Sequence, residues 1–125
     1  MKQWIVRLVT AGSLLLPVTA MPLTQEDFLV KTTRDLLNLC SATADDPMQK
    51  EATHMCHGYL IGAVHYHEAA VSLGRKRLVC FPNPAPSRNE AVAEFVQWAK
   101  ARPQHMNELP VETEFRFLME KWPCK

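Results

Sequence analysis

Neither sign of charge dominates this sequence of 125 residues, which has 14 lysines and arginines and 13 aspartates and glutamates. That balance provides no extended basic surface for nucleic acid or for an anionic membrane. Only one long apolar run occurs, near the start, so no second segment predicts a membrane crossing. No stretch shows the sustained apolar and polar alternation that is typical of a half-buried strand. The sequence therefore predicts an all-α protein.

Motifs of common catalytic sites are also missing. There is no G-x-S-x-G nucleophile elbow, no glycine-rich phosphate loop and no H-E-x-x-H zinc motif. Histidines do crowd one expected helix, but His57 and His65 lie two turns apart, roughly 12 Å along the axis, which is too far for one metal ion. His67 falls on the opposite, apolar face and is expected to be a hydrogen-bonded interior or interface residue. We therefore expect no catalytic residue, metal or cofactor, while a His-dependent metal enzyme stays the enzymatic alternative.

The first twenty residues have the pattern of a signal peptide. Lys2 and Arg7 give a short positive region, residues 8–18 are apolar, and small residues precede a cleavage point after Ala20. This pattern predicts a signal peptide over residues 1–20, export from the cytoplasm and one mature domain over residues 21–125.

Four cysteines lie in the expected mature part, and an even number in a short exported chain favours two disulfides. A zinc site would instead favour closely spaced pairs, which are absent. Antiparallel packing of the first two expected helices would bring Cys40 near Cys56, which leaves Cys80 to pair with Cys124. The two closed loops would stabilise the fold by roughly 3 and 4 kcal/mol in the chain-entropy model.

Four main helices are expected, and together they predict a small bundle braced by the two disulfides. The first opens at Thr24, with Asp27 as a loose capping box, and ends near Ser41. The second starts at Asp46-Pro47 and runs to Leu73, with Gly74 as its stop. The third is capped by Ser87 with Glu90 and continues until Pro103. The last follows Pro110, and its expected apolar stripe consists of Val111, Phe115, Leu118, Met119 and Trp122.

Two further features need a structural or functional use. Gly58 and Gly62 each cost the second helix about 1 kcal/mol relative to alanine. Lying four residues apart beside Tyr59, they predict close packing against a helix of the same chain or against a second subunit. Residues 82–86 contain three prolines and are expected to form a stiff, exposed loop.

The order of motifs resembles the Tai-type (Rap/Tai) immunity proteins. The resemblance spans about Phe28 to Cys124 and is carried by Leu39-Cys40, by Cys56-His57-Gly58-Tyr59-Leu60-Ile61-Gly62, by Cys80-Phe81-Pro82, by Arg102-Pro103 and by Trp122-Pro123-Cys124. It implies an all-helical periplasmic protein that forms a homodimer in the manner of the family and neutralises a peptidoglycan amidase effector delivered by a type VI secretion system.

A non-catalytic inhibitor needs a surface that blocks the cleft of its partner, and a rigid loop loses little entropy on docking. The first candidate surface is the proline loop, with Phe81, Asn83, Ser87 and Arg88, and the second is the acidic turn Asp45-Asp46. The alternative function is a general periplasmic stress or envelope protein on the same scaffold, with no cognate toxin.

Overall fold

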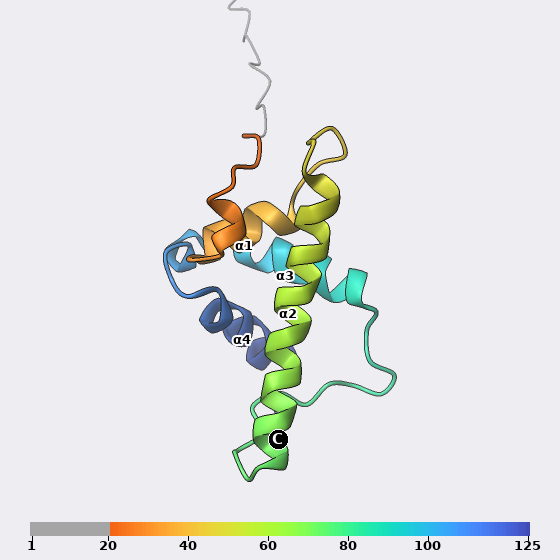
Figure 1. The fold of residues 1–125 in the computed structure, drawn as a ribbon. Helices are drawn as coiled ribbons and strands as arrows, with labels where there is room; N and C mark the ends of the chain where they lie inside the picture. Colours follow the sequence, from red (N-terminus) through yellow and green to blue (C-terminus); the bar gives the residue numbers. More distant parts are fainter. Residues whose placement is uncertain (1–20) are drawn as a thin grey trace, which may run out of the picture.

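The computed structural model describes residues 21–125, so the expected signal peptide lies outside the described residues. The described chain has no strand and contains only an isolated antiparallel bridge between Val79 and Pro123. No helix among residues 21–125 has the length and apolar character needed to span a membrane. The all-α fold with four main helices is thus confirmed (Figure 1). These are α1 (Thr33–Cys40), α2 (Gln49–Ser72), α3 (Arg88–Lys100) and α4 (Pro110–Lys121), with 3-10 turns η1 (Asp27–Leu29) and η2 (Pro103–His105).

The first helix begins later than expected. The capping residues Thr24 and Asp27 do meet, because the Thr24 amide donates to the Asp27 carboxylate at 2.7 Å, but they open only the single turn η1. Val30 then adopts a left-handed conformation with φ 48°, which interrupts the helix. A capping box between Thr32 and Asp35 then starts α1. The prediction of one helix from Thr24 was therefore wrong, since Thr24 and Asp27 form no reciprocal capping box and the buried Asp27 instead accepts a hydrogen bond from Asn38 of α1.

The second helix starts slightly later than expected and ends at its expected stop. Asp46 accepts a hydrogen bond from the Met48 amide at 2.8 Å through its carboxylate, and its carbonyl accepts one from Gln49 at the start of α2. The helix ends at Ser72, followed by Gly74 with φ 92°, a conformation that glycine adopts readily.

The third helix matches its expected start. The Ser87 hydroxyl accepts from the Glu90 amide, and the Glu90 carboxylate accepts from the Ser87 amide, so both arms of the capping box are present. This reciprocal pair satisfies two amide groups that the first turn would otherwise leave without partners.

The last helix begins at Pro110 as expected, but its buried face is rotated relative to the expected stripe. Val111 and Met119 are exposed, whereas Thr113, Glu114 and Phe117 are buried. A hydrogen bond of 2.6 Å between the hydroxyls of Thr113 and Thr33 joins α4 to α1. The contact with α1 therefore selects a face that includes two polar residues, which an apolar stripe could not reveal.

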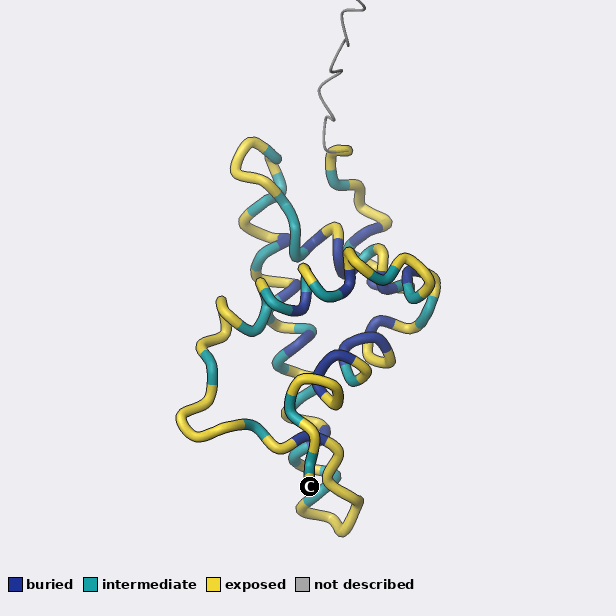
Figure 2. Tube along the Cα trace, turned by 180° about the vertical axis from the view of Figure 1, so that it is seen from behind, coloured by how far each residue is buried: buried dark blue, intermediate teal, exposed yellow. Residues whose placement is uncertain are grey.

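The core lies where α1, α3 and α4 meet the middle of α2. Its most deeply buried side chains include Leu36 and Leu39 of α1 and Phe95 of α3, and Phe95 meets Phe117 of α4 edge to face at 5.8 Å. Figure 2 shows that buried positions concentrate between the helices, while the lower end of α2 and the loop after it are mostly exposed. The long helix α2 thus extends beyond the core that it helps to build.

Two disulfides brace the fold, and both expected pairings are confirmed. Cys40 pairs with Cys56, which joins the end of α1 to α2, and Cys80 pairs with Cys124, which joins the segment after α2 to the chain end. No free cysteine remains among the described residues. The second disulfide lies beside the Val79–Pro123 bridge, where the Cys80 amide also donates to the Trp122 carbonyl at 2.9 Å.

Candidate functional site

The proline loop, defined here as residues 81–88, is a long exposed connection held at both ends. At its start the Cys80–Cys124 disulfide and the hydrogen bond to Trp122 fix the backbone to the end of α4. At its other end the capping box of Ser87 fixes the first turn of α3. The loop stands away from the helices between these two points (Figures 1 and 2). The sequence prediction of an exposed stiff loop thus has a structural basis in its prolines and its two fixed ends.

Not every candidate residue of the proline loop points to solvent. The Phe81 side chain is partly buried, and its ring lies 5.2 Å from the Trp122 ring in a tilted arrangement. The Ser87 hydroxyl is engaged in the capping box. The side chains of Asn83 and Arg88 are exposed. The accessible polar groups of this loop are therefore those of Asn83 and Arg88, while Phe81 and Ser87 hold the loop in place.

The two aspartates of the acidic turn also differ, since one is engaged in hydrogen bonds of the turn and the other is exposed. One oxygen of the Asp46 carboxylate accepts from the Leu23 amide at 2.9 Å and the other accepts from the Met48 amide, so this carboxylate organises the turn. Asp45 is exposed, and a hydrogen bond from the Thr43 side chain lowers the pKa of its carboxyl. The acidic turn lies beyond the N-terminal end of α2, and the proline loop lies on the opposite side of α3, so the two candidate surfaces are not brought together (Figures 1 and 2).

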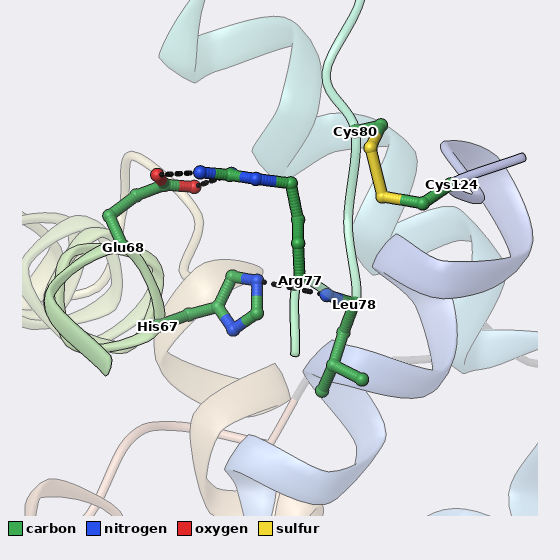
Figure 3. Close-up of a disulfide and its surroundings, with 6 residues drawn as sticks. All are labelled: His67, Glu68, Arg77, Leu78, Cys80 and Cys124. Atoms are coloured by element: carbon green, nitrogen blue, oxygen red, sulfur yellow. Dashed lines mark hydrogen bonds and ion pairs between the residues drawn. A yellow bond between two sulfur atoms is a disulfide. The ribbon is translucent and has the colours of Figure 1, made fainter. Parts of the chain in front are cut away.

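The histidines of α2 take two different environments. His67 is buried, its Nε2 accepts from the Leu78 amide at 3.2 Å, and its ring meets Phe115 edge to face at 5.3 Å. Figure 3 shows this bond beside the paired side chains of Glu68 and Arg77, which are joined by two hydrogen bonds of 2.6 and 2.9 Å. The prediction that His67 is a hydrogen-bonded interior residue is confirmed, and its role is to fasten the segment after α2 to the helix.

The other histidines line a shallow depression on the outer face of α2. It is bordered by Thr53, His54, His57, Gly58, Ile61, Gly62, His65 and Arg88. Within residues 21–125, no group of three or more histidine, cysteine or carboxylate side chains is placed to hold a metal ion.

The two glycines of α2 lie on this open face. A Cβ atom added at Gly58 or Gly62 would meet no atom of the described chain within 4 Å. The structure therefore does not show the close approach of a neighbouring helix that was one of the two expected uses of this pair. Tyr59, between them, is half-buried on the other side of α2, where burial and the nearby Glu114 raise the pKa of its hydroxyl.

A buried carboxyl group was missed by the sequence analysis. Glu114 of α4 is only 2 % exposed, and burial raises its pKa to about 9. It lines a half-open cavity of about 180 Å³ whose walls also include residues of α2, α3 and the proline loop. The available signal was its spacing, because Glu114 lies four residues before Leu118 and so shares a helix face with a core residue.

The chain belongs to the Rap1a immunity protein family, because the model of the Rap1a immunity proteins matches residues 32–124. The match begins at the cap of α1 and ends at the last disulfide cysteine, so it includes all four helices, both disulfides and the proline loop. None of the curated proteins and none of the solved structures compared with the chain matches it significantly. Membership of this family implies an immunity function that is exercised by binding a cognate secreted effector.

Proposed function

We propose that this protein is exported to the periplasm through a signal peptide of residues 1–20 and there inhibits a peptidoglycan amidase effector of a type VI secretion system. The observation that carries the proposal is the family match over residues 32–124. The specific effector class comes from the motif order that resembles the Tai-type proteins. In this role the chain supplies no chemistry of its own, since covering the cleft of the amidase is sufficient to stop cleavage.

The proline loop is the surface that we propose for this contact. Its prolines restrict the backbone, and its two ends are fixed by the Cys80–Cys124 disulfide and the Ser87 capping box. A segment that is already ordered loses little conformational entropy when it enters a cleft, so more of the contact energy appears as affinity. Asn83 and Arg88 provide the exposed polar groups, and an arginine suits an acidic or aromatic partner surface.

Inhibition is tested by mixing the purified mature protein with the amidase encoded beside its gene and following peptidoglycan cleavage. We expect cleavage to stop near a one-to-one molar ratio. Full amidase activity at a several-fold molar excess of this protein would contradict the proposal for that pair. A gene with no amidase beside it would favour the alternative envelope protein without a cognate toxin.

The binding surface is tested by charge-matched variants. Arg88→Ala should weaken inhibition at least about tenfold, because a desolvated arginine is a common source of interface energy. Lys50→Ala, which removes an exposed cation near the start of α2, should leave inhibition unchanged. Asp45→Asn tests the acidic turn without disturbing the carboxylate of Asp46 that holds it. If Asp45→Asn weakens inhibition and Arg88→Ala does not, the acidic turn and not the proline loop contacts the effector.

We also propose that two copies associate through the face of α2 that carries Gly58 and Gly62. This face is open in the described chain, and an added Cβ would meet nothing there. Glycines cost helix stability, so a second backbone at this face would give them a use that the single chain does not. The face also borders Arg88, which would place the proline loop beside the contact between the copies.

A further inference from the structure

The half-open cavity beneath the proline loop is lined almost entirely by apolar side chains. Its volume is about 180 Å³, and residues of α2, α3, α4 and the loop all contribute to its walls. Apolar lining residues include Leu60, Val64, Phe81, Pro86, Phe95 and Phe117. An apolar cavity of about 150 Å³ accepts benzene, so this one has room for one aromatic ring.

Three of these lining residues are held in place by contacts between aromatic rings. Phe95 meets Phe117 edge to face at 5.8 Å, and the ring of Phe81 lies 5.2 Å from the ring of Trp122. The second disulfide also fixes the backbone directly before Phe81. Because the walls are already ordered, an apolar body that enters the cavity loses little free energy to their ordering.

A cationic side chain stands where this cavity meets a second hollow. Arg88 lines the cavity and is exposed to solvent. Arg88 and Ile61 also line the shallow depression on the outer face of α2, so the two hollows adjoin. That depression is bordered by His54, His57 and His65, and by no aspartate or glutamate of residues 21–125. An anionic group beside Arg88 would therefore meet side chains that can donate hydrogen bonds to it and no carboxylate of the depression.

We propose that the half-open cavity binds a small amphiphilic carboxylate, with an apolar body about the size of one aromatic ring inside the cavity and its carboxylate on Arg88. The planar guanidinium group of an arginine can donate two parallel hydrogen bonds to a carboxylate. Burial of the apolar body provides most of the affinity. Arg88 selects the charge of the head group.

Two carboxyl groups close to this site do not oppose an anionic head group. Glu114 lines the cavity, but it is buried and burial raises its pKa to about 9, so the group is neutral at pH 7. Glu90, two residues after Arg88, lies on a different side of α3. There its carboxylate accepts a hydrogen bond from the Ser87 amide at 2.8 Å. Neither group therefore places a negative charge in the cavity.

Four probes test the proposal at pH 7, namely hydrocinnamate, hydrocinnamamide, phenylpropylamine and propionate. Ligand-observed NMR titrations give the dissociation constants, with the protein at a few micromolar because the site adjoins the face proposed for association of two copies. We expect hydrocinnamate to bind about two- to fivefold more tightly than its amide, which is the ratio that an exposed ion pair supplies. It should bind at least about tenfold more tightly than propionate, which lacks the ring. Equal binding of hydrocinnamate and its amide, or no binding of hydrocinnamate, would overturn the proposal.

Substitutions of Arg88 test the contact with the head group. Arg88→Gln should bind hydrocinnamate and its amide equally, and Arg88→Glu should reverse the order and favour the amine. Lys100→Gln removes an exposed cation at the other end of α3 and should keep the preference of the unmodified protein. An unchanged preference for hydrocinnamate in Arg88→Glu would show that Arg88 does not hold the carboxylate.

Two substitutions in α3 test the position of the ring. Ala91 lines the cavity, whereas Ala93 of the same helix is exposed and does not. Ala91→Phe should fill the cavity and weaken the binding of hydrocinnamate at least about tenfold, because the ring is excluded. Ala93→Phe should leave binding unchanged, and equal binding by the two variants would overturn the assignment to this cavity. Should Ala91→Phe fail to fold, the order of the probes and the Arg88 variants decide the question. These titrations contain no amidase, so their outcome is independent of the proposed inhibition.

Discussion

At the scale of the residue, Glu114 makes stability depend on pH. Its folded pKa is about 9 against an ordinary value of 4.5, so between these values the folded chain keeps a proton that the unfolded chain has released. The free energy of unfolding therefore falls as pH rises through this window, by up to about 1.4 kcal/mol per pH unit. From pH 6 to 8, we expect the unmodified protein to lose about 1 to 3 kcal/mol more than Glu114→Gln. Urea unfolding at several pH values measures the difference.

Every other titratable group is common to the two proteins, so this comparison isolates Glu114. Glu112→Gln is the matched control, because Glu112 is an exposed carboxylate in the same helix. It should follow the unmodified protein at every pH. Identical slopes for Glu114→Gln and the unmodified protein would show that Glu114 is ionised in the folded state near neutral pH.

At the scale of the element, the capping box that starts α3 could be predicted from sequence, but the residue at which the first helix starts could not. The sequence predicted the capping box of Ser87 and Glu90, and this box starts α3 in the structure. The first helix was expected to start at Thr24-Asp27, whereas α1 begins at the capping box of Thr32 and Asp35, and the Asp27 carboxylate accepts a hydrogen bond from Asn38 in the folded chain. The buried face of α4 likewise depends on the Thr33–Thr113 contact between helices distant in sequence.

For the candidate surfaces too, features set by neighbouring residues could be predicted, whereas features set by contacts between distant residues could not. The proline content of residues 82–86 predicted an exposed loop, which requires only local backbone restriction. That Phe81 turns inward to Trp122 depends on the Cys80–Cys124 disulfide bringing the chain end beside the loop. The cysteine pairing itself was predictable because four cysteines on consecutive elements leave few sensible partners.

The cap of α3 gives a prediction at this scale. Ser87→Ala should lower the free energy of unfolding by about 1 kcal/mol, because the Glu90 amide loses its acceptor. Asn89→Ala, in the same exposed first turn, should change it by less than about 0.5 kcal/mol. Chemical unfolding measures both. A Ser87→Ala protein as stable as the unmodified one would mean that water replaces the hydroxyl without cost.

At the scale of the whole molecule, the two disulfides should differ in their effect on function. Replacing Cys40 and Cys56 by serine should cost about 3 kcal/mol, and replacing Cys80 and Cys124 about 4 kcal/mol, since the second pair closes the longer loop. Only the second pair fixes the proline loop, so only its loss should weaken inhibition at a temperature where both variants stay folded. Unfolding curves and the peptidoglycan assay measure the two effects. Equal inhibition by both variants would contradict the role given to the loop.

Substitutions at Gly58 and Gly62 of α2 should have opposite effects on the stability of a single chain and on the association of two chains. In a single chain, Gly58→Ala with Gly62→Ala should raise the free energy of unfolding by about 1 to 2 kcal/mol, because alanine favours the helix and the added methyl groups meet no described atom. In a dimer packed on this face, the same methyl groups would hold the two backbones apart. We therefore expect the double variant to be the more stable chain and the weaker dimer, whereas Ser72→Ala, at the exposed end of the same helix, should alter neither property much. Light scattering at tens of micromolar measures association and thermal unfolding of dilute protein measures stability. A monomeric unmodified protein at that concentration would exclude the dimer, and the glycines would then remain a cost to α2 without a partner that uses them.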